Sequence, residues 1–231
     1  MSQTSEIINQ AKKENRKVLL EPEPEIICME YGIPVGKFKV ALNEDEAARY
    51  ADEIGYPVVL KIVSPDIIHK SDAGAVIINL KNPAEVTEAY KKILENVGKY
   101  NANAKIVGVL VQEMAPQSTE TIVGAIKDPQ FGQTLMFGLG GIFVEIFKDV
   151  SFRIAPITPD DAKEMITELK SYPLLKGFRN TPPADIDALV NVLCNTSRLV
   201  MDHPEIKELD LNPVIAYQKG ARAVDARIIL E

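Results

Sequence analysis

Residues 61–78 read Lys61-Ile-Val-Ser-Pro-Asp-Ile-Ile-His-Lys-Ser-Asp-Ala-Gly-Ala-Val-Ile-Ile78, two apolar runs joined by a polar loop. Side chains alternate across a β-strand, so Val59, Lys61 and Val63 share one face of the strand that precedes the loop. This alternation aims the Lys61 ammonium at a surface of the sheet. The pattern predicts two strands connected by a loop that carries chemistry.

The loop holds His69, one of only two histidines among 231 residues. Ser71, Asp72 and Gly74 form its small-residue end, and a strand lysine followed by such a loop can cradle phosphates. Imidazole is neutral and nucleophilic near pH 7, which makes His69 a candidate nucleophile. From this loop alone, a surface histidine without a role is the simpler interpretation.

Composition limits the class of protein. The chain is 46% hydrophobic and 26% charged, as ordinary globular proteins are, and its net charge of −7 favours neither nucleic acid nor anionic membranes. Cys28 and Cys194 are too far apart in sequence to suggest a zinc site, and reduced thiols in a cytoplasmic protein are favoured over a disulfide. A polar N-terminus and the lack of a long apolar run predict neither a signal peptide nor a transmembrane span.

The first half of the sequence predicts a compact β-α-β-β-α unit. Asn43 with Glu46, and Asn82 with Glu85, are spaced as capping boxes that begin helices. Helices are expected at 4–17, 22–31, 43–55 and 82–98, and strands at 38–42, 57–63 and 75–80. We therefore expect an N-terminal helical extension over residues 1–21 and a first α+β subdomain over 22–108, which includes the His69 loop.

The second half is richer in strands. Strands are expected at 106–114, 119–127, 134–137, 143–147 and 151–157, helices at 158–177 and 184–201, and a closing hairpin at 208–217 and 221–229. We place the boundary between the subdomains in the segment 106–116, so that the second α+β subdomain covers residues 109–231.

The closing hairpin carries a polar face. Asp210 and Asn212 lie on the same side of its first strand, and a turn centred between Gln218 and Lys219 sets Asn212 opposite Asp225. Carboxylate and amide oxygens are hard ligands of the kind that Mg²⁺ takes together with substrate phosphates. The hairpin therefore predicts a metal site, although a solvated sheet face explains the same residues nearly as well.

A glycine loop, Gly138-Leu-Gly-Gly141, is followed by Glu145 and, one strand later, by Arg153. It matches neither the dinucleotide-binding fingerprint nor the P-loop. Arg153 alternates with Phe152 and Ile154, which places one cation on the polar side of an apolar strand. A surface arginine would give the same pattern.

Five blocks in this order resemble the ATP-grasp fold, an α+β fold with two subdomains that bind a nucleotide between their sheets. More narrowly, they resemble the β subunit of archaeal ADP-forming acetyl-CoA synthetases, also called NDP-forming acyl-CoA synthetases. The blocks are Glu30-Tyr-Gly-Ile-Pro34, Gly55-Tyr-Pro-Val-Val-Leu-Lys61, Ser64-Pro-Asp-Ile-Ile-His-Lys-Ser-Asp-Ala-Gly74, Met136-Phe-Gly-Leu-Gly-Gly-Ile-Phe-Val-Glu-Ile-Phe-Lys148 and Glu208-Leu-Asp-Leu-Asn-Pro213.

The resemblance implies a role for each block. His69 matches the loop histidine that this family uses as a second phosphoryl carrier, beyond the general ATP-grasp pattern. Nucleotide contacts are implied for Lys61, Ser71, Gly74, the hinge residues Gln112, Glu113 and Met114, Glu120 and Arg153. Mg²⁺ ligands are implied at Asp210, Asn212 and Asp225, with possible support from Glu145. ATP or ADP is the implied nucleotide substrate.

The resemblance also implies a partner. Related succinyl-CoA synthetase β subunits continue into a further domain, whereas this sequence stops six residues after Asp225. A separate α subunit would then carry the CoA and acyl-phosphate sites, in an α₂β₂ assembly that converts acyl-CoA, ADP and phosphate into carboxylic acid, ATP and CoA. The alternatives are an ATP-grasp carboxylate–amine ligase without protein phosphorylation and a non-catalytic nucleotide-sensing module.

Overall fold

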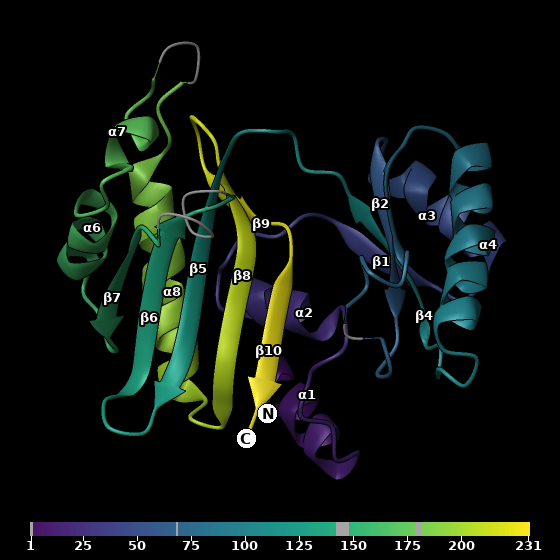
Figure 1. Cartoon of the computed structure of the whole chain (residues 1–231), viewed down its shortest axis with the longest axis horizontal. Coiled ribbons are helices and arrows are strands. Elements are labelled where there is room, and N and C mark those ends of the chain that lie inside the picture. The colour runs from purple at the N-terminus through teal and green to yellow at the C-terminus, as the bar shows by residue number, and fades with distance from the viewer. Residues whose placement is uncertain (1, 68, 142–147, 179–181) are drawn as a thin grey trace. The chain divides into compact units, whose positions relative to one another are not determined.

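The computed structural model describes residues 2–67, 69–141, 148–178 and 182–231, as a mixed α+β protein (Figure 1). The chain forms two compact units. The large unit comprises Met1–Leu19, Pro24–Val35 and Pro116–Glu231, and the small unit comprises Leu20–Glu23 and Gly36–Ala115. Among the described helices, none is long and apolar enough to cross a membrane.

The small unit is a four-stranded antiparallel sheet with two helices. Its strand order is β1-β4-β2-β3. The strands are β1 (Phe38–Ala41), β2 (Val58–Val63), β3 (Val76–Leu80) and β4 (Gly108–Glu113), and the helices are α3 (Glu44–Ile54) and α4 (Pro83–Tyr100). Leu60 and Ile62 of β2 pack with Ala51 and Ile93 of these helices in one core. By alternation, Lys61 lies on the sheet face that α3 and α4 do not cover.

Both helices of the small unit begin at the predicted asparagines, but the carboxylates of Glu46 and Glu85 accept from the backbone N–H of Leu42 and Lys81, so the capping boxes are formed only in part. The Asn43 side chain accepts a hydrogen bond from the Glu46 backbone N–H at 2.8 Å, and Asn82 accepts one from the Glu85 N–H at 3.0 Å. These bonds satisfy backbone donors that a helix start leaves without an intrahelical partner. Pro83, at the start of α4, has no N–H to satisfy.

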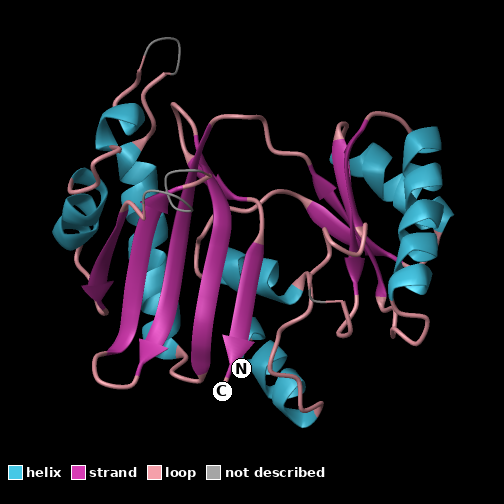
Figure 2. Cartoon of the chain, in the orientation of Figure 1, coloured by secondary structure: helices cyan, strands magenta, loops and turns pink. Residues whose placement is uncertain are grey.

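The large unit is a six-stranded sheet with helices on one face (Figure 2). Its order is β10-β8-β5-β6-β7, with β9 also paired to β8. The strands are β5 (Thr119–Asp128), β6 (Gly132–Leu139), β7 (Val150–Ile154), β8 (Ile206–Ala216), β9 (Ala221–Ala223) and β10 (Ala226–Leu230). The helices that follow β7 are α6 (Pro159–Thr167), α7 (Tyr172–Leu175) and α8 (Ile186–Asp202).

The expected subdomain boundaries were wrong. Helices α1 (Gln3–Lys13) and α2 (Glu23–Glu30) form no separate extension, because Ile8 and Ile27 are buried in the same core as the strands of the large unit. A cut between residues 108 and 109 would also remove β4 from the small unit, where it hydrogen-bonds to both β1 and β2. The first unit instead continues to Ala115.

Two of the expected elements are interrupted. The helix expected over 158–177 divides into α6 and α7, where Pro173 lacks the N–H that a continuous helix would require. The returning strand of the closing hairpin divides into β9 and β10. The strand expected at 143–147 lies outside the described residues.

The two ends of the chain pair with each other in the large unit. Leu19 donates its backbone N–H to the Ile228 carbonyl at 3.0 Å, and Leu230 donates to the Lys17 carbonyl at 2.7 Å. The segment that follows α1 therefore continues the sheet beside β10. Figure 1 shows the C-terminal end of β10 next to α1.

Glu30, in the first block of the family resemblance, has a structural role. Its carboxylate accepts hydrogen bonds from the backbone N–H and the hydroxyl of Thr4, both at 2.6 Å, and from the Gln3 N–H at 3.2 Å. The two backbone N–H groups belong to the first turn of α1, where a helix offers them no intrahelical acceptor. The hydrogen bond from the Thr4 hydroxyl is the main reason that the pKa of Glu30 lies below its usual range.

The residues after Glu30 join α2 to α8. Arg198 donates to the Tyr31 carbonyl at 2.8 Å, and Asn195 donates to the Gly32 carbonyl at 3.1 Å. Gly32 has φ of +75°, a backbone conformation that favours glycine at the end of a helix. The first block is thus a packing junction of three helices.

We predict that Glu30→Gln lowers the free energy of unfolding by about 1 kcal/mol near neutral pH, a modest figure because the carboxylate is exposed. A lowered pKa in the folded state means that this stabilisation is complete above the usual glutamate range and is lost as the pH falls through the lowered pKa. Melting temperatures from pH 7 to pH 3 should therefore converge for wild type and variant. Glu88→Gln, which changes an exposed glutamate on α4, is the control. A difference in melting temperature between wild type and Glu30→Gln that does not narrow in acid would contradict the structural role of the Glu30 carboxylate.

Candidate active site

Lys61 and Gln112 occupy the face of the small sheet opposite α3 and α4. Lys61 pairs with Leu110 of β4 and with Val76 of β3, while Gln112 pairs with Val59. The Lys61 side chain is only 7% exposed, an unusual place for an ammonium group. A lysine held in this way by a central strand can neutralise an anion that reaches the face.

The expected hinge residues end β4 and lead out of the small unit. The Glu113 N–H donates to the Lys37 carbonyl at 2.8 Å, and the Met114 N–H donates to the Pro57 carbonyl at 3.1 Å. The unit ends one residue later, at Ala115. The segment therefore has fixed backbone positions up to the connection, and its contact with a nucleotide stays a prediction.

The loop between β2 and β3 is fixed at its ends and presents His69 to solvent. Ile67 and Ala73 are buried, whereas His69 is exposed. Gly74 has φ of +59°, and a Cβ on it would lie 2.8 Å from the Asn96 side-chain nitrogen, which donates to the Gly74 carbonyl at 2.8 Å. Gly74 is thus required by the turn itself, and its N–H donates to the Ser71 carbonyl at 3.0 Å.

The closing hairpin brings together the three expected metal ligands. Asn212 lies directly opposite Asp225 and donates its backbone N–H to the Asp225 carbonyl at 3.2 Å, as a turn between Gln218 and Lys219 predicts. Burial raises the pKa of Asp210, and the charge of Asp225 raises it further; Arg227 and a side-chain hydrogen bond with Asn212 act in the opposite direction. The convergence of these groups on one patch is confirmed.

Arg153 does not lie on the face that carries Asp210. Cross-strand neighbours share a face, and Asp210 pairs with Gly124, which pairs with Met136 and then Phe152. These residues line a hollow of about 250 Å³. Arg153 points to the other, helix-covered face, where its guanidinium binds both carboxylate oxygens of Glu168 in a bidentate pair at 2.8 and 3.0 Å.

The structure therefore gives Arg153 an ion pair on the helix-covered side, which argues against the expected contact with a nucleotide. Phe152 and Ile154 are about half exposed, so these apolar residues lie on the solvent-facing side of β7. Arg153 between them lies on the side that packs against the helices. The Glu168 carboxylate is the main cause of the raised pKa of Arg153. Glu145 lies outside the described residues.

Glu120 and the glycine loop lie against each other. The Gly140 N–H donates to the Glu120 carbonyl at 2.8 Å, and a Cβ on Gly140 would approach the Glu120 Cβ to 3.0 Å. The glycine therefore allows a close backbone approach at the start of β5. Glu120 is exposed, and its contact with ribose or phosphate stays a prediction.

Comparisons with known proteins agree with this geometry. The family model of the ATP-grasp domain matches residues 10–230. The chain is 56% identical over 230 residues to the ADP-forming acetate–CoA ligase I subunit beta of Pyrococcus furiosus, covering 100% of this chain and 99% of that protein. The chain belongs to the ATP-grasp family. Within it, the chain falls among the β subunits of ADP-forming acetate–CoA ligases.

Solved structures of the dinucleotide-forming acetyl-coenzyme A synthetase 1 of Candidatus Korarchaeum cryptofilum have the same fold. The complex with coenzyme A, Ca-AMPCP and HgCl⁺ matches with a TM-score of 0.96 and 52% identity, covering 99% of this chain and 100% of that one. A complex with coenzyme A and Mg-AMPPCP, its phosphohistidine segment pointing towards the nucleotide binding site, matches with a TM-score of 0.87 and 49% identity over 99% and 100%.

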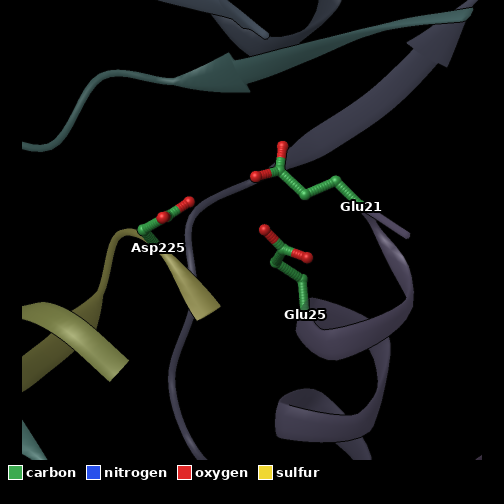
Figure 3. Close-up of side chains that lie close together, drawn as sticks. All are labelled: Glu21, Glu25 and Asp225. Carbon is green, nitrogen blue, oxygen red and sulfur yellow. The ribbon is translucent and has the colours of Figure 1, made fainter. Parts of the chain in front are cut away.

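In this ATP-grasp chain, sequence reasoning missed Glu25. This residue of α2 is buried, and one of its carboxylate oxygens lies within 4.8 Å of an Asp225 oxygen (Figure 3). Figure 3 shows the two carboxylates pointing towards each other. The only local signal is a glutamate on a mostly apolar helix, and nothing in the sequence joins α2 to the closing hairpin.

The donor set of the hairpin fits Mg²⁺. Asp210, Asn212 and Asp225 offer carboxylate and amide oxygens. Burial and the charge of Asp225 raise the pKa of Asp210, and a divalent cation would offset both effects. Asn212 is exposed and Asp225 is half-buried, so a bound ion could still reach substrate phosphates.

We predict that Asn212→Ala and Asp225→Ala each weaken Mg·ADP binding by roughly 10- to 100-fold or more. Loss of a residue that only hydrogen-bonds to a metal ligand already costs about that much affinity. Calorimetric titration of ADP with and without Mg²⁺ measures this effect. Glu208→Gln, on the same face of β8, is the matched control. Arg153→Gln should lower the melting temperature but leave the affinity for Mg·ADP unchanged. If the Asn212 and Asp225 variants also bind Mg·ADP as tightly as the wild type, the polar face of the hairpin is a solvated surface and not a metal site.

Proposed function

We propose that this chain is the nucleotide-binding β subunit of an ADP-forming acetyl- or acyl-CoA synthetase, and that His69 carries the phosphoryl group to ADP. The exposed imidazole of His69, on a loop fixed at both ends, is the observation that carries the proposal. The names of the relatives support it: one is a β subunit of an acetate–CoA ligase, and one was solved with a phosphohistidine segment and Mg-AMPPCP.

The family resemblance assigns the proposed nucleotide contacts to the following residues. Lys61 would neutralise the phosphates, the hinge at Gln112–Met114 would receive the adenine, and Glu120 would lie near the ribose or phosphates. Ser71 and Gly74 would contribute backbone groups of the loop. Mg²⁺, held by Asp210, Asn212 and Asp225 with support from Glu145, would offset the charge of the phosphates.

The chemistry of the transfer suits a histidine. A ring nitrogen of neutral His69 attacks the γ-phosphorus of ATP, the new N–P bond forms as the P–O bond to ADP breaks, and the ADP oxygen keeps the electron pair. The imidazolium then loses its remaining ring proton to water or an acceptor. In the opposite direction, ADP takes the phosphoryl group and His69 regains its neutral form. Such a loose transition state depends mostly on positioning and on nearby cations such as Lys61.

An α subunit would supply the other half of the reaction. In the proposed relay, acyl-CoA and phosphate give acyl phosphate on α, which phosphorylates a histidine of α before the group passes to His69. The β-subunit name of the relative supports a separate partner. The proposed assembly holds two copies of each chain, α₂β₂.

We predict that His69→Ala abolishes phosphorylation of the chain by labelled ATP but retains its melting temperature and nucleotide affinity, because the imidazole is exposed and its loss leaves no cavity. Phosphohistidine is recognised as acid-labile, base-stable label. His203→Asn is the matched control, since the second histidine is buried at the end of α8.

Acid-labile phosphate label on the His69→Ala variant would refute the role of His69 as phosphoryl carrier. A wild-type chain that binds Mg·ADP but never becomes labelled would favour the carboxylate–amine ligase chemistry, which needs no protein phosphorylation.

We also predict that the 231-residue chain alone cannot turn over acyl-CoA and gains this activity with an α chain. Co-purification followed by light scattering should give a mass of two copies of each chain. Full acyl-CoA synthetase activity from the isolated chain would contradict this division of labour.

A further inference from the structure

The residue that follows His69 is tied to a buried acid. The Lys70 ammonium lies 3.0 Å from a carboxylate oxygen of Glu21, and the two side chains are 24% and 4% exposed. Both residues belong to the small unit, Glu21 through the short segment Leu20–Glu23. Figure 3 draws the Glu21 side chain.

The burial of this ion pair sets it apart. Ion pairs elsewhere in the small unit join side chains that are 39–68% exposed: Lys39–Glu53, Lys91–Glu44 and Lys99–Glu95. Exposed pairs contribute little because water and salt screen them. A pair with a buried carboxylate is screened less, and separating it leaves a charge in a place that water reaches poorly. The Glu21–Lys70 pair therefore holds its two segments together more firmly.

The pair acts between the two buried ends of the loop. Ile67 is buried before His69, and Ala73 is buried after it. Between these anchors, the loop is closed by backbone hydrogen bonds from Ala73 to the His69 carbonyl at 3.2 Å and from Ala75 to the Lys70 carbonyl at 2.8 Å. These bonds lie within the loop, so they do not join it to the rest of the unit, and they open more readily once the loop is released. The Lys70 side chain is the tie that reaches from this stretch to the segment that precedes α2.

We infer that Glu21 is a positioning residue for His69: through Lys70 it docks the loop and so fixes where the imidazole stands. The inference rests on the proposed role of His69 as a phosphoryl carrier. A carrier that serves two sites must be held at each long enough to react, because a small misplacement of a reacting group is costly. Release of Lys70 from Glu21 is then the step that frees the loop to move.

Amide hydrogen exchange on the full chain tests the docking. We expect Glu21→Gln to speed exchange at the Ala73 and Ala75 amides roughly tenfold, since a hydrogen bond to a charged group is worth about that factor. Lys70→Gln, on the loop itself, should have the same effect and covers the case in which the Glu21 variant does not fold. Glu95→Gln, which removes the exposed partner of Lys99 in α4, is the matched control.

A double variant decides whether the two side chains act as one pair. Glu21→Gln combined with Lys70→Gln should exchange no faster than either single variant, because both remove the same interaction. Unchanged exchange in the single variants, or effects that multiply in the double variant, would overturn the inference.

A functional measurement separates docking from the carrier role. With the α subunit present, Glu21→Gln should lower kcat by roughly 10- to 100-fold while the affinity for Mg·ADP stays unchanged. Faster exchange with an unchanged kcat would overturn the positioning role. Failure of His69 to become phosphorylated in the wild type would refute the proposed function, and the exchange data would still report whether Glu21 docks the loop.

Discussion

The alternation of side chains along strands packed on one side by helices is the constraint on which both units depend. In β8, Leu209 and Leu211 are buried against the helices, so Asp210 and Asn212 must point to the other face. In β2, Leu60 and Ile62 fix Lys61 in the same way. Hydrophobic burial thus holds the polar groups of the site in place, and a slip of one residue in either strand would move all of them into the core.

The sequence was sufficient where the deciding contact is local. Helix starts at the capping asparagines, strand faces and the hairpin register around Gln218 and Lys219 depend on residues close together in the chain, and the predictions from them are confirmed. Predictions failed where the deciding contact is distant. Alternation assigned Arg153 to one side of β7 but could not tell which side the helices cover. The place of α1 and α2 depends on strands in the second half of the chain, as does the closeness of Glu25 to Asp225.

The blocks that carry a family resemblance do not all carry chemistry. Glu30 and the residues after it join three helices, and Gly74 and Gly140 satisfy a turn and a close backbone approach. The hairpin block supplies the expected metal ligands, and the loop block supplies the candidate carrier. A short motif shared with relatives can therefore record a packing requirement as readily as a reaction, and the contacts of each residue tell the two apart.

The pairing of the chain ends has a consequence for biosynthesis. The large unit needs residues before Leu19 and after Ala226 in one sheet, whereas most of the small unit is the continuous stretch Gly36–Ala115. Contacts between residues near in sequence form early, and distant ones are delayed by the entropy of closing a long loop. As the ribosome releases the polypeptide, the small unit can fold first, while the large unit waits for the residues of β10. A stalled or prematurely terminated chain would therefore present the half that carries His69 without the half that carries the metal ligands.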